Sequence, residues 1–444
     1  MPRILMAGVV APSGLGDELQ YVVGVSLIAK YFGDADIDLF IPSASLNTPH
    51  TIIPSRNIRV FQGFSEQTGI LGALRRFLND NTTKKVSQKL MSSEYHVEGS
   101  KGLINKLKEM AFKKYYENAL IITYVRPAIS RLLNGLKYDA GFIGGHTIEY
   151  SAFFDYLITY NCARTLVKGP LITYPISISS IGIKYREQYL KALRKALQRF
   201  DVIFVRGRYS YNTFTKFVDS KRLLTALDSG FGIRFLVENT HNSITRRRDL
   251  VVCVVPRKDY FYFYHLSYMY PRYLLALKHL IEVLISEFNV NVLLVPHTIG
   301  SATRLDDEYA VLDLLKVLNG TLKRDVMVIK PHNILESVQI FSSCNVVVTS
   351  RMHAGIVSLA YGKPTVFFMP RDDIKVLDIL SYLGLDEERY IVDCFNVKEY
   401  NKLIEVVKSI LLNLSQETKT VESTVNKHLP DVEKPVILAK KLLS

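Results

Sequence analysis

The sequence predicts an α/β protein made of two Rossmann-like domains whose parallel sheets face a shared cleft. Short β-branched segments alternate with longer segments of helical period in both halves of the chain, which is the pattern of βαβ units. The length of 444 residues exceeds the roughly 100 to 200 residues of a single domain. A polar, unpatterned stretch at 238–248 separates the two halves.

The C-terminal half shows the alternation most regularly. Its expected strands lie at 250–255, 290–295, 326–329, 345–349, 365–369 and 390–393, and its expected helices at 271–287, 306–318, 335–342, 353–361, 374–383 and 398–412. We therefore predict a Rossmann-like domain over 249–420. A final helix near 434–443, within 421–444, is a candidate for packing back on the N-terminal domain.

The N-terminal half repeats this organisation over 1–237. Its expected strands lie at 4–10, 37–41, 140–143, 171–174 and 202–205, and a basic helical insertion over about 65–137 interrupts them. Two such domains leave a cleft at the carboxyl ends of their strands, where ligands bind in open α/β sheets. This is a GT-B-like architecture in outline.

The composition excludes several classes of protein. No uninterrupted apolar run reaches the roughly 18 residues of a membrane-spanning helix. The first ten residues indicate a strand rather than a signal peptide, because the apolar run is short and leads into a glycine loop. The four cysteines are far apart and form no CxxC pair, which predicts neither zinc nor disulfides and favours a cytoplasmic location; they are Cys162, Cys253, Cys344 and Cys394.

The formal charge of +14 is concentrated in the expected insertion. Residues 75–137 contain 13 Lys/Arg against 5 Asp/Glu, a net of +8. Such a block suits an anionic membrane surface, an anionic polymer or nucleic acid. Nucleic acid is the least favoured partner, because no recognisable binding module accompanies the charge. The stretch 102–123 fits either a membrane-surface helix or an amphipathic helix docked on a core.

A glycine-containing loop is expected between the first strand and a helix that begins near Leu19. Gly14 and Gly16 would let backbone N–H groups approach a ligand, and the helix N-terminus favours an anion. Asp17 would repel a phosphate placed directly on it and is suited to cap the helix. The segment is therefore either a ligand-binding loop or a structural turn.

A second motif, Ser350-Arg351-Met352-His353, lies where an expected strand gives way to a helix. Ser350 is suited to cap the helix, and Arg351 can grip a carboxylate or phosphate with two hydrogen bonds. His353 would lie in the first turn, where the helix dipole lowers the pKa of its imidazole and keeps it neutral. These features predict an anion site, with a surface arginine and a capping histidine as the alternative.

Other groups near expected strand ends are candidates for the same cleft. The basic ones, which together could form a pocket for a polyanion, are His146, Arg206, Arg208, Arg257, Lys258, His297 and Arg371. The pair Asp306-Asp307 indicates the start of a helix rather than a metal site. The aromatic run 260–264 either stacks on sugar rings or packs as a loop.

These motifs together resemble the polysaccharide pyruvyl transferase family. The resemblance depends on segments that occur in the family's order along most of the chain: Leu15-Gly16-Asp17-Glu18, Gly144-Gly145, 202–211 with Ser210, Leu227-Asp228-Ser229, Thr349-Ser350-Arg351-Met352-His353-Ala354 and Gly362-Lys363-Pro364.

The resemblance implies a GT-B-like fold and phosphoenolpyruvate as the donor. It also implies that the product is a pyruvate ketal on a sugar of a cell-surface polysaccharide or a lipid-linked glycan precursor. We expect no cofactor, and no metal is needed in principle, because cationic groups can stabilise the departing phosphate. The family's donor-binding arginine and histidine correspond to Arg351 and His353.

We therefore expect phosphoenolpyruvate in the cleft, held by Arg351, Ser350, Arg206 and the helix N-terminus. His353 is the candidate acid–base group, and His146 and His297 are the alternative candidates. The variant Arg351→Ala should lose donor binding while its fold stays intact. The alternatives are a GT-B glycosyltransferase that uses a nucleotide sugar and a non-catalytic glycan-assembly protein at the inner face of the membrane.

Overall fold

The structure of the protein is a computed structural model that describes residues 1–8, 15–41, 57–62, 137–148, 153–178, 193–237, 250–298, 306–318, 320 and 322–444. Gly14, the stretch at 102–123, the linker at 238–248 and all of the basic insertion except Lys137 lie outside these residues, as does the side chain of Asp17. The expectations for these segments stay predictions.

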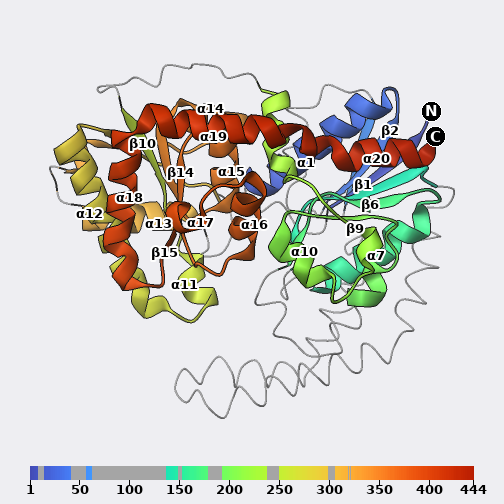
Figure 1. Ribbon diagram of the computed structural model, residues 1–444, viewed down its shortest axis with the longest axis horizontal. Coiled ribbons are helices and arrows are strands. Elements are labelled where there is room, and N and C mark those ends of the chain that lie inside the picture. Colours follow the sequence, from blue (N-terminus) through green and yellow to red (C-terminus); the bar gives the residue numbers. More distant parts are fainter. Residues whose placement is uncertain are drawn as a thin grey trace, which may run out of the picture.

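Six parallel strands form the sheet of the C-terminal domain in the order β12-β11-β10-β13-β14-β15 (Figure 1). They are Val251–Val255 (β10), Asn291–Leu294 (β11), Val326–Val328 (β12), Val346–Thr349 (β13), Thr365–Met369 (β14) and Ile391–Asp393 (β15). All six were predicted. Their order is the Rossmann order 3-2-1-4-5-6, which places a ligand-binding switch point at the carboxyl ends of β10 and β13.

The N-terminal sheet follows the same plan, with the order β3-β2-β1-β4-β6. Its strands are Arg3–Ala7 (β1), Asp36–Ile41 (β2), Ile58–Gln62 (β3), Ala140–Ile143 (β4) and Leu171–Thr173 (β6). Bridges at Ile172↔Val202 and Ile176↔Val205 extend it to β8 (Ile203–Val205), which pairs with β9 (Leu223–Thr225). The short strands β5 (Thr147–Ile148) and β7 (Ser177–Ile178) form a separate pair.

The helices of the C-terminal domain include all six that were predicted. They are Tyr270–Phe288 (α12), Asp307–Val317 (α13), Ile334–Ser343 (α14), Met352–Ala360 (α15), Ile374–Leu383 (α16) and Tyr400–Leu412 (α18). Two short helices were not predicted: Asp259–Phe263 (α11) and Glu387–Tyr390 (α17). The N-terminal domain contains Leu15–Phe32 (α1), Phe153–Leu166 (α7) and Arg208–Phe214 (α10).

Helix α1 begins earlier than predicted. It starts at Leu15 rather than near Leu19, so Gly16 and Asp17 belong to its first turn and not to a loop. Leu15 and Leu19 are both buried and lie one helical turn apart, so both contribute to the apolar face of α1. The expectation that Asp17 caps this helix is therefore wrong.

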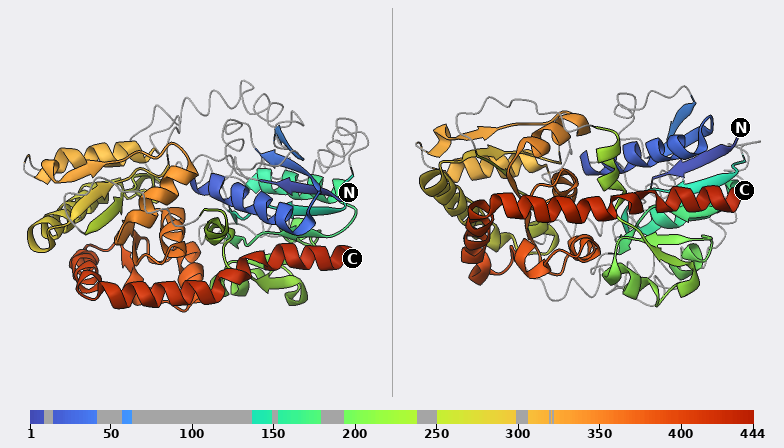
Figure 2. Two further views of the ribbon diagram at one scale, coloured as in Figure 1. Left: turned by 90° about the horizontal axis from the view of Figure 1, so that it is seen from above. Right: turned by 45° about the horizontal axis from the view of Figure 1, so that its top comes forward.

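The last two helices run from the C-terminal domain to the N-terminal domain. Leu414–His428 (α19), the 3₁₀ turn Leu429–Glu433 (η9) and Lys434–Leu443 (α20) form this strap, which ends beside α1 and β6 (Figures 1 and 2). Glu433 accepts hydrogen bonds from Lys30 (2.5 Å) and Tyr31 (2.7 Å) of α1. Among the described residues, no helix combines the length and apolarity that crossing a membrane requires.

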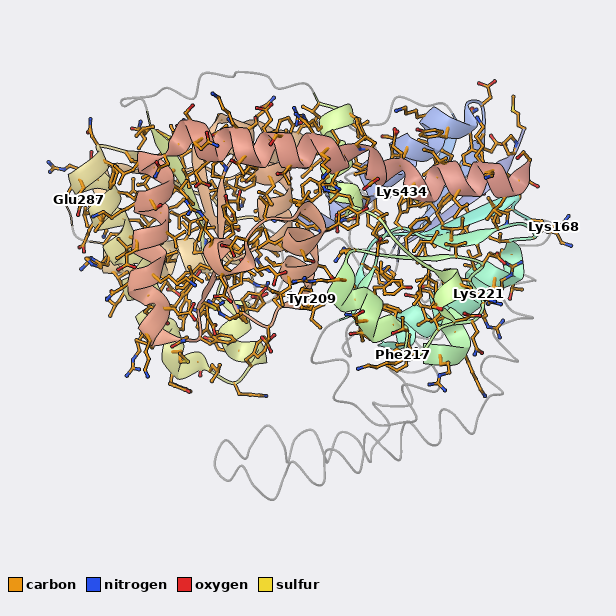
Figure 3. The ribbon with its side chains drawn as sticks, viewed as in Figure 1. Lys168, Tyr209, Phe217, Lys221, Glu287 and Lys434 are labelled. Carbon is orange, nitrogen blue, oxygen red and sulfur yellow. The ribbon has the colours of Figure 1, made fainter. Side chains whose placement is uncertain are left out.

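The domains also meet at the N-terminus of α10. Asp378 of α16 accepts hydrogen bonds from the backbone N–H groups of Tyr209 (2.9 Å) and Ser210 (3.0 Å), and Glu387 binds the Tyr209 hydroxyl (2.6 Å). Tyr209 accordingly lies at the junction of the two domains (Figure 3). A β-carbon at Gly207 would come within 2.6 Å of the Asp378 carbonyl oxygen, so this approach requires glycine. Helices α10 and α16 thus dock the two domains against each other.

Candidate active site

The candidate site lies at the carboxyl ends of β10, β11 and β13, opposite the start of α1. Thr349 shapes the turn between β13 and α15: its hydroxyl oxygen accepts from the Arg351 N–H (2.9 Å) and its O–H donates to the Arg351 carbonyl (3.0 Å). Arg351 therefore occupies the N-cap position without a side-chain cap. The strand-to-helix turn that the sequence predicted is present here.

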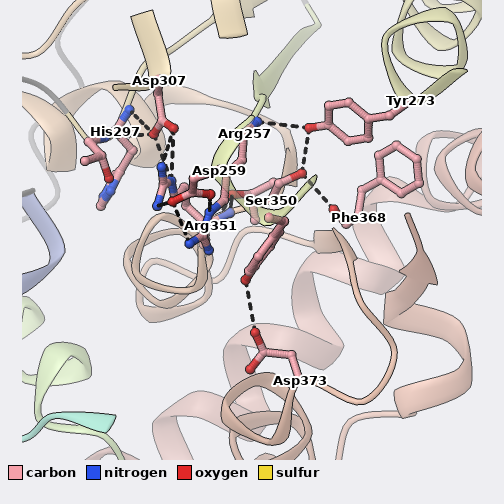
Figure 4. Close-up of polar contacts among 12 residues, drawn as sticks. Arg257, Asp259, Tyr273, His297, Asp307, Ser350, Arg351, Phe368 and Asp373 are labelled. Atoms are coloured by element: carbon pink, nitrogen blue, oxygen red, sulfur yellow. Dashed lines mark hydrogen bonds and ion pairs between the residues drawn. The ribbon is translucent and has the colours of Figure 1, made fainter. Parts of the chain in front are cut away.

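Ser350 does not have the role expected of it. Its buried hydroxyl donates to the Phe368 carbonyl of β14 (2.7 Å) and lies 2.8 Å from the Tyr273 hydroxyl of α12 (Figure 4). The prediction that Ser350 caps α15 is wrong, because these two neighbours hold its side chain. We assign Ser350 to anchoring the turn against the sheet.

Arg351 is held between two buried carboxylates. Its Nε donates to Asp307 Oδ2 (2.9 Å), its Nη2 to Asp307 Oδ1 (2.5 Å) and its Nη1 to Asp259 Oδ2 (3.2 Å). Asp307 is fully buried and also accepts from the backbone N–H groups of His297 (3.2 Å) and Thr298 (2.8 Å). The guanidinium that was expected to grip a ligand with two hydrogen bonds already makes that interaction with Asp307.

Arg257 extends this cluster on the other side of Asp259. Its Nη2 lies 2.9 Å from Asp259 Oδ2, and its guanidinium lies 3.5 Å from the centre of the Tyr260 ring. Burial acts to raise the pKa of Asp259, but Arg257 and Arg351 outweigh it and lower the pKa to about 2. Two cations thus alternate with two anions, Arg257–Asp259–Arg351–Asp307 (Figure 4), and the four formal charges sum to zero.

His353 lies in the first turn of α15 and faces the N-terminal domain. A β-carbon at Gly16 would come within 2.1 Å of its Nδ1, so Gly16 allows α1 to approach the imidazole. Burial, and then the nearby cations Arg206 and Lys375, lower the pKa of His353 well below its usual value. The imidazole is therefore neutral at pH 7, as predicted, but burial and neighbouring cations are the causes found here.

Arg206 reaches the same place from the end of β8. It is 1% exposed, its Nε lies 2.5 Å from Asp228 Oδ2, and its Nη1 donates to Thr147 Oγ1 (3.1 Å). Its Nη1 also lies 4.0 Å from the sulfur of Met352, the residue before His353. Arg206 also acts electrostatically on the His353 ring, so these two predicted site residues lie near one another.

The two alternative candidates for the acid–base group, His146 and His297, differ in their surroundings. His146 is buried in the N-terminal domain, where its Nδ1 lies 2.5 Å from the Gly144 carbonyl and its Nε2 lies 2.7 Å from the Tyr160 hydroxyl. His297 is also buried, but its Nε2 has no hydrogen-bond partner in the structure that is described. Burial lowers the pKa of both to about 3, so both are neutral. Of these two histidines, His297 is the one whose buried Nε2 is unpaired among the described residues.

The expected pocket for a polyanion is not formed by the other basic groups. Each has a carboxylate partner: Arg208 with Glu387 (2.8 Å), Lys258 with Asp313 (2.7 Å) and Arg371 with Glu388 (2.5 Å). Since these ion pairs neutralise the cations locally, a large cationic pocket does not follow from their positions at strand ends. The Asp306-Asp307 pair lies at the start of α13, as predicted, and Asp306 caps this helix by accepting from the Glu308 N–H (2.9 Å).

Several contacts of the site were not predicted from the sequence. Asp259 and Asp307 lie beside Arg351, Gln20 lies beside both His353 and Asp228, and Lys375 of α16 acts electrostatically on His353 and Asp259. Asp228 belongs to the motif Leu227-Asp228-Ser229 and Asp307 to the Asp306-Asp307 pair, in which only the first aspartate is needed as the cap. Neither motif indicates its partner, because each pairing joins positions far apart in sequence.

Glu18 is a further buried acid on α1. It is 6% exposed, and its Oε1 has no hydrogen-bond partner within the described ranges. Burial raises the pKa of Glu18 to about 7, although a hydrogen bond from the Ile334 backbone opposes the shift. The folded protein therefore retains a proton here that the unfolded chain releases at lower pH.

Glu18→Gln is accordingly expected to stabilise the protein at pH 8 and to change its stability little at pH 5. Because the folded-state pKa is raised from 4.5 to about 7, wild-type stability falls as the pH rises through this window. The gain for the variant at pH 8 should be at most about 3 kcal/mol. Urea unfolding at both pH values measures it, with exposed Glu405→Gln as the control. An equal change at both pH values would show that Glu18 does not titrate in this way.

Among the residues that the structure describes, no group of three or more His, Cys, Asp or Glu side chains is arranged to hold a metal ion. The site consists instead of a neutral imidazole, buried ion pairs and a helix N-terminus. Such a site can bind and polarise an anionic organic ligand through fixed charges and dipoles.

Comparison with solved structures shows the fold. UDP-GlcNAc 2-epimerase from Neisseria meningitidis, solved with UDP-GlcNAc, is 11% identical with a TM-score of 0.56 over 100% of both chains. A trehalose-6-phosphate protein from E. coli, solved with UDP-2-fluoro glucose, is 12% identical with a TM-score of 0.56 over 99% of this chain and 98% of that one. Sucrose-phosphate synthase from Thermosynechococcus elongatus is 12% identical with a TM-score of 0.54 over 100% and 99%. The predicted GT-B-like fold is confirmed.

The sequence itself was compared with curated proteins and with family models. The search of curated proteins found no match. The family model of polysaccharide pyruvyl transferase matches residues 15–372, which include α1, β8 and the Ser350–His353 turn. The chain belongs to the polysaccharide pyruvyl transferase family.

Proposed function

We propose that the protein transfers a pyruvyl group from phosphoenolpyruvate to a sugar of a cell-surface polysaccharide or a lipid-linked glycan precursor, forming a pyruvate ketal. The observation that carries this proposal is the position of His353. Its neutral imidazole lies at the N-terminus of α15, and the charged groups that act on it are the cations Arg206 and Lys375. An anionic donor would find both charge complementarity and a proton-carrying group there.

The reaction needs one proton to move to carbon. A sugar hydroxyl adds to C2 of phosphoenolpyruvate while the methylene carbon C3 gains a proton, so the hydroxyl proton balances the one consumed. A neighbouring hydroxyl then displaces phosphate at C2, and its proton leaves with the phosphate. His353 is the group that we assign to the proton transfer, and the surroundings that lower its pKa make its protonated form a stronger acid.

The other residues have separate roles in this proposal. Arg206, Lys375 and the free N–H groups at the start of α15 bind the carboxylate and phosphate. Asp259 and Asp307 hold Arg351 in a single orientation, since they engage three of its nitrogen atoms. His297 contributes its unpaired Nε2 to the same cleft. No cofactor is required, because phosphate is the leaving group. The basic segment at 75–136 lies outside the described residues, so its contact with an anionic membrane stays a prediction.

Thermal unfolding with added ligand tests the donor. Phosphoenolpyruvate at 100 times its dissociation constant should stabilise the protein by about 2.7 kcal/mol and raise its melting temperature, if it binds only the folded state. Lys375→Met should reduce that shift. Lys323→Met is the matched control, because Lys323 is exposed and precedes β12, at the opposite end of the sheet. A shift with a nucleotide sugar and none with phosphoenolpyruvate would instead assign glycosyl transfer.

A further inference from the structure

Gln20 joins the two domains at His353. It lies on α1 with 3% of its surface exposed, and its amide nitrogen lies 2.6 Å from Asp228 Oδ1 and 3.3 Å from His353 Nε2. The Ser229 hydroxyl donates to the amide oxygen of Gln20. All of the polar atoms of this side chain are therefore engaged.

The partners of Gln20 allow one arrangement of hydrogen atoms. The Asp228 carboxylate accepts hydrogen bonds, so the amide NH₂ of Gln20 must face it, and the second N–H then points at His353. An amide nitrogen only donates, which makes His353 Nε2 the acceptor. The ring proton of neutral His353 is consequently on Nδ1, the atom that lies against Gly16.

Asp228 is itself fixed in place. Its Oδ2 lies 2.5 Å from Arg206 Nε, and its Oδ1 accepts from the Gly230 N–H (2.8 Å). The chain Arg206–Asp228–Gln20–His353 therefore runs from the N-terminal domain to α15 of the C-terminal domain. Its last link exists only while the start of α1 is docked against α15.

We propose that Gln20 is a positioning residue that holds the ring proton of His353 on Nδ1, and that it does so only in the docked arrangement of the two domains. The proposal rests on pyruvyl transfer as the proposed function, in which His353 meets the anionic donor. Because Gln20 of the docked helix α1 supplies the hydrogen bond to Nε2, domain docking and the tautomer of His353 become linked.

The charges around His353 define how variants of Gln20 should behave. Arg206 and Lys375 are the cations that act on the ring, beside the neutral imidazole of His297, and the Asp228 carboxylate accepts a hydrogen bond from Gln20. Gln20→Met removes the donor to Nε2 without adding charge, so both tautomers should appear. Gln20→Glu places a carboxylate near Nε2, which should favour the protonated ring and raise the pKa of His353.

Nitrogen NMR of the full-length protein labelled in its histidine rings reports these states directly. The signals of His353 are identified among the 10 histidines by their loss in His353→Asn. Wild type should show a protonated Nδ1 and an unprotonated Nε2, and Gln20→Met a mixture of the two tautomers. Titration with phosphoenolpyruvate should give about tenfold weaker binding in Gln20→Met, the equivalent of one lost hydrogen bond. Exposed Gln198→Met is the control and should match wild type.

The outcomes separate this proposal from the proposed function. A proton on Nε2 in wild type, or tautomer populations that Gln20→Met leaves unchanged, would overturn the role of Gln20 even if phosphoenolpyruvate binds. The expected NMR pattern without any binding of phosphoenolpyruvate would support the role of Gln20 and reject the donor. The expected tautomers together with weaker binding of phosphoenolpyruvate in Gln20→Met support both the role of Gln20 and the proposed donor.

Discussion

Replacing His353 by alanine is expected to lower the rate of pyruvyl transfer by about 10²- to 10⁴-fold, the usual contribution of a positioned acid–base group. Phosphoenolpyruvate should still bind, because Arg206, Lys375 and the N-terminus of α15 remain. The side chain is confined between α15 and Gly16, so no other described residue can take its position. Release of phosphate from phosphoenolpyruvate in the presence of the acceptor glycan measures the loss.

Two isosteric variants make the test more specific. The amide nitrogen of His353→Asn lies near the position of Nδ1, and that of His353→Gln lies near Nε2. If the Nδ1 proton matters, the asparagine variant should keep more activity than the glutamine variant. Exposed His279→Ala is the control and should behave as wild type. Full activity in His353→Ala would reject the catalytic role of this residue.

Arg351→Ala is expected to destabilise the protein by about 3 to 5 kcal/mol, because it leaves the buried Asp307 without its cation and removes one of the two that flank Asp259. This differs from the expectation drawn from sequence, in which the variant kept its fold and lost only donor binding. Urea unfolding at pH 7 gives the change in the free energy of unfolding. Any loss of donor binding must be measured below the melting temperature of the variant.

A second substitution separates the buried charge from the ligand contact. The double variant Arg351→Met, Asp307→Asn no longer contains the uncompensated buried carboxylate. It should therefore regain most of the stability that Arg351→Ala loses. Lys408→Met, which breaks the partly exposed pair with Glu287 (2.5 Å), is the control and should cost less than about 1 kcal/mol. A stability of Arg351→Ala close to wild type would contradict the alternating ion-pair cluster. Donor binding that stays absent in the stable double variant would assign Arg351 to the ligand as well.

Much of the fold was predictable because its signals are local. The β-branched strands from 250 to 393 and the helices that follow them were predicted from hydrophobic period alone, and all six of each are present. The elements that were not predicted include the longer helices α7 and α19 and several short strands. In β3, Arg59 and Gln62 interrupt the apolar pattern, and in β9 two of the three residues are exposed, so neither had a recognisable period. The start of α1 was misplaced because glycine and aspartate at 16 and 17 are usually residues of loops.

The candidate site likewise has features that depend on local sequence and features that depend on the tertiary structure. The sequence by itself determined that a strand-to-helix turn carries Arg351 and His353, since the turn depends on neighbours within a few residues. Only the tertiary structure decided that Asp259 and Asp307 neutralise Arg351, that Gly16 makes room for His353, and that Gln20 and Asp228 orient its imidazole. Partners such as Gln20 and His353, or Asp307 and Arg351, are brought together by the docking of domains and the order of strands. The energy of such contacts comes from burial and hydrogen bonding between distant segments, which local sequence pattern does not encode.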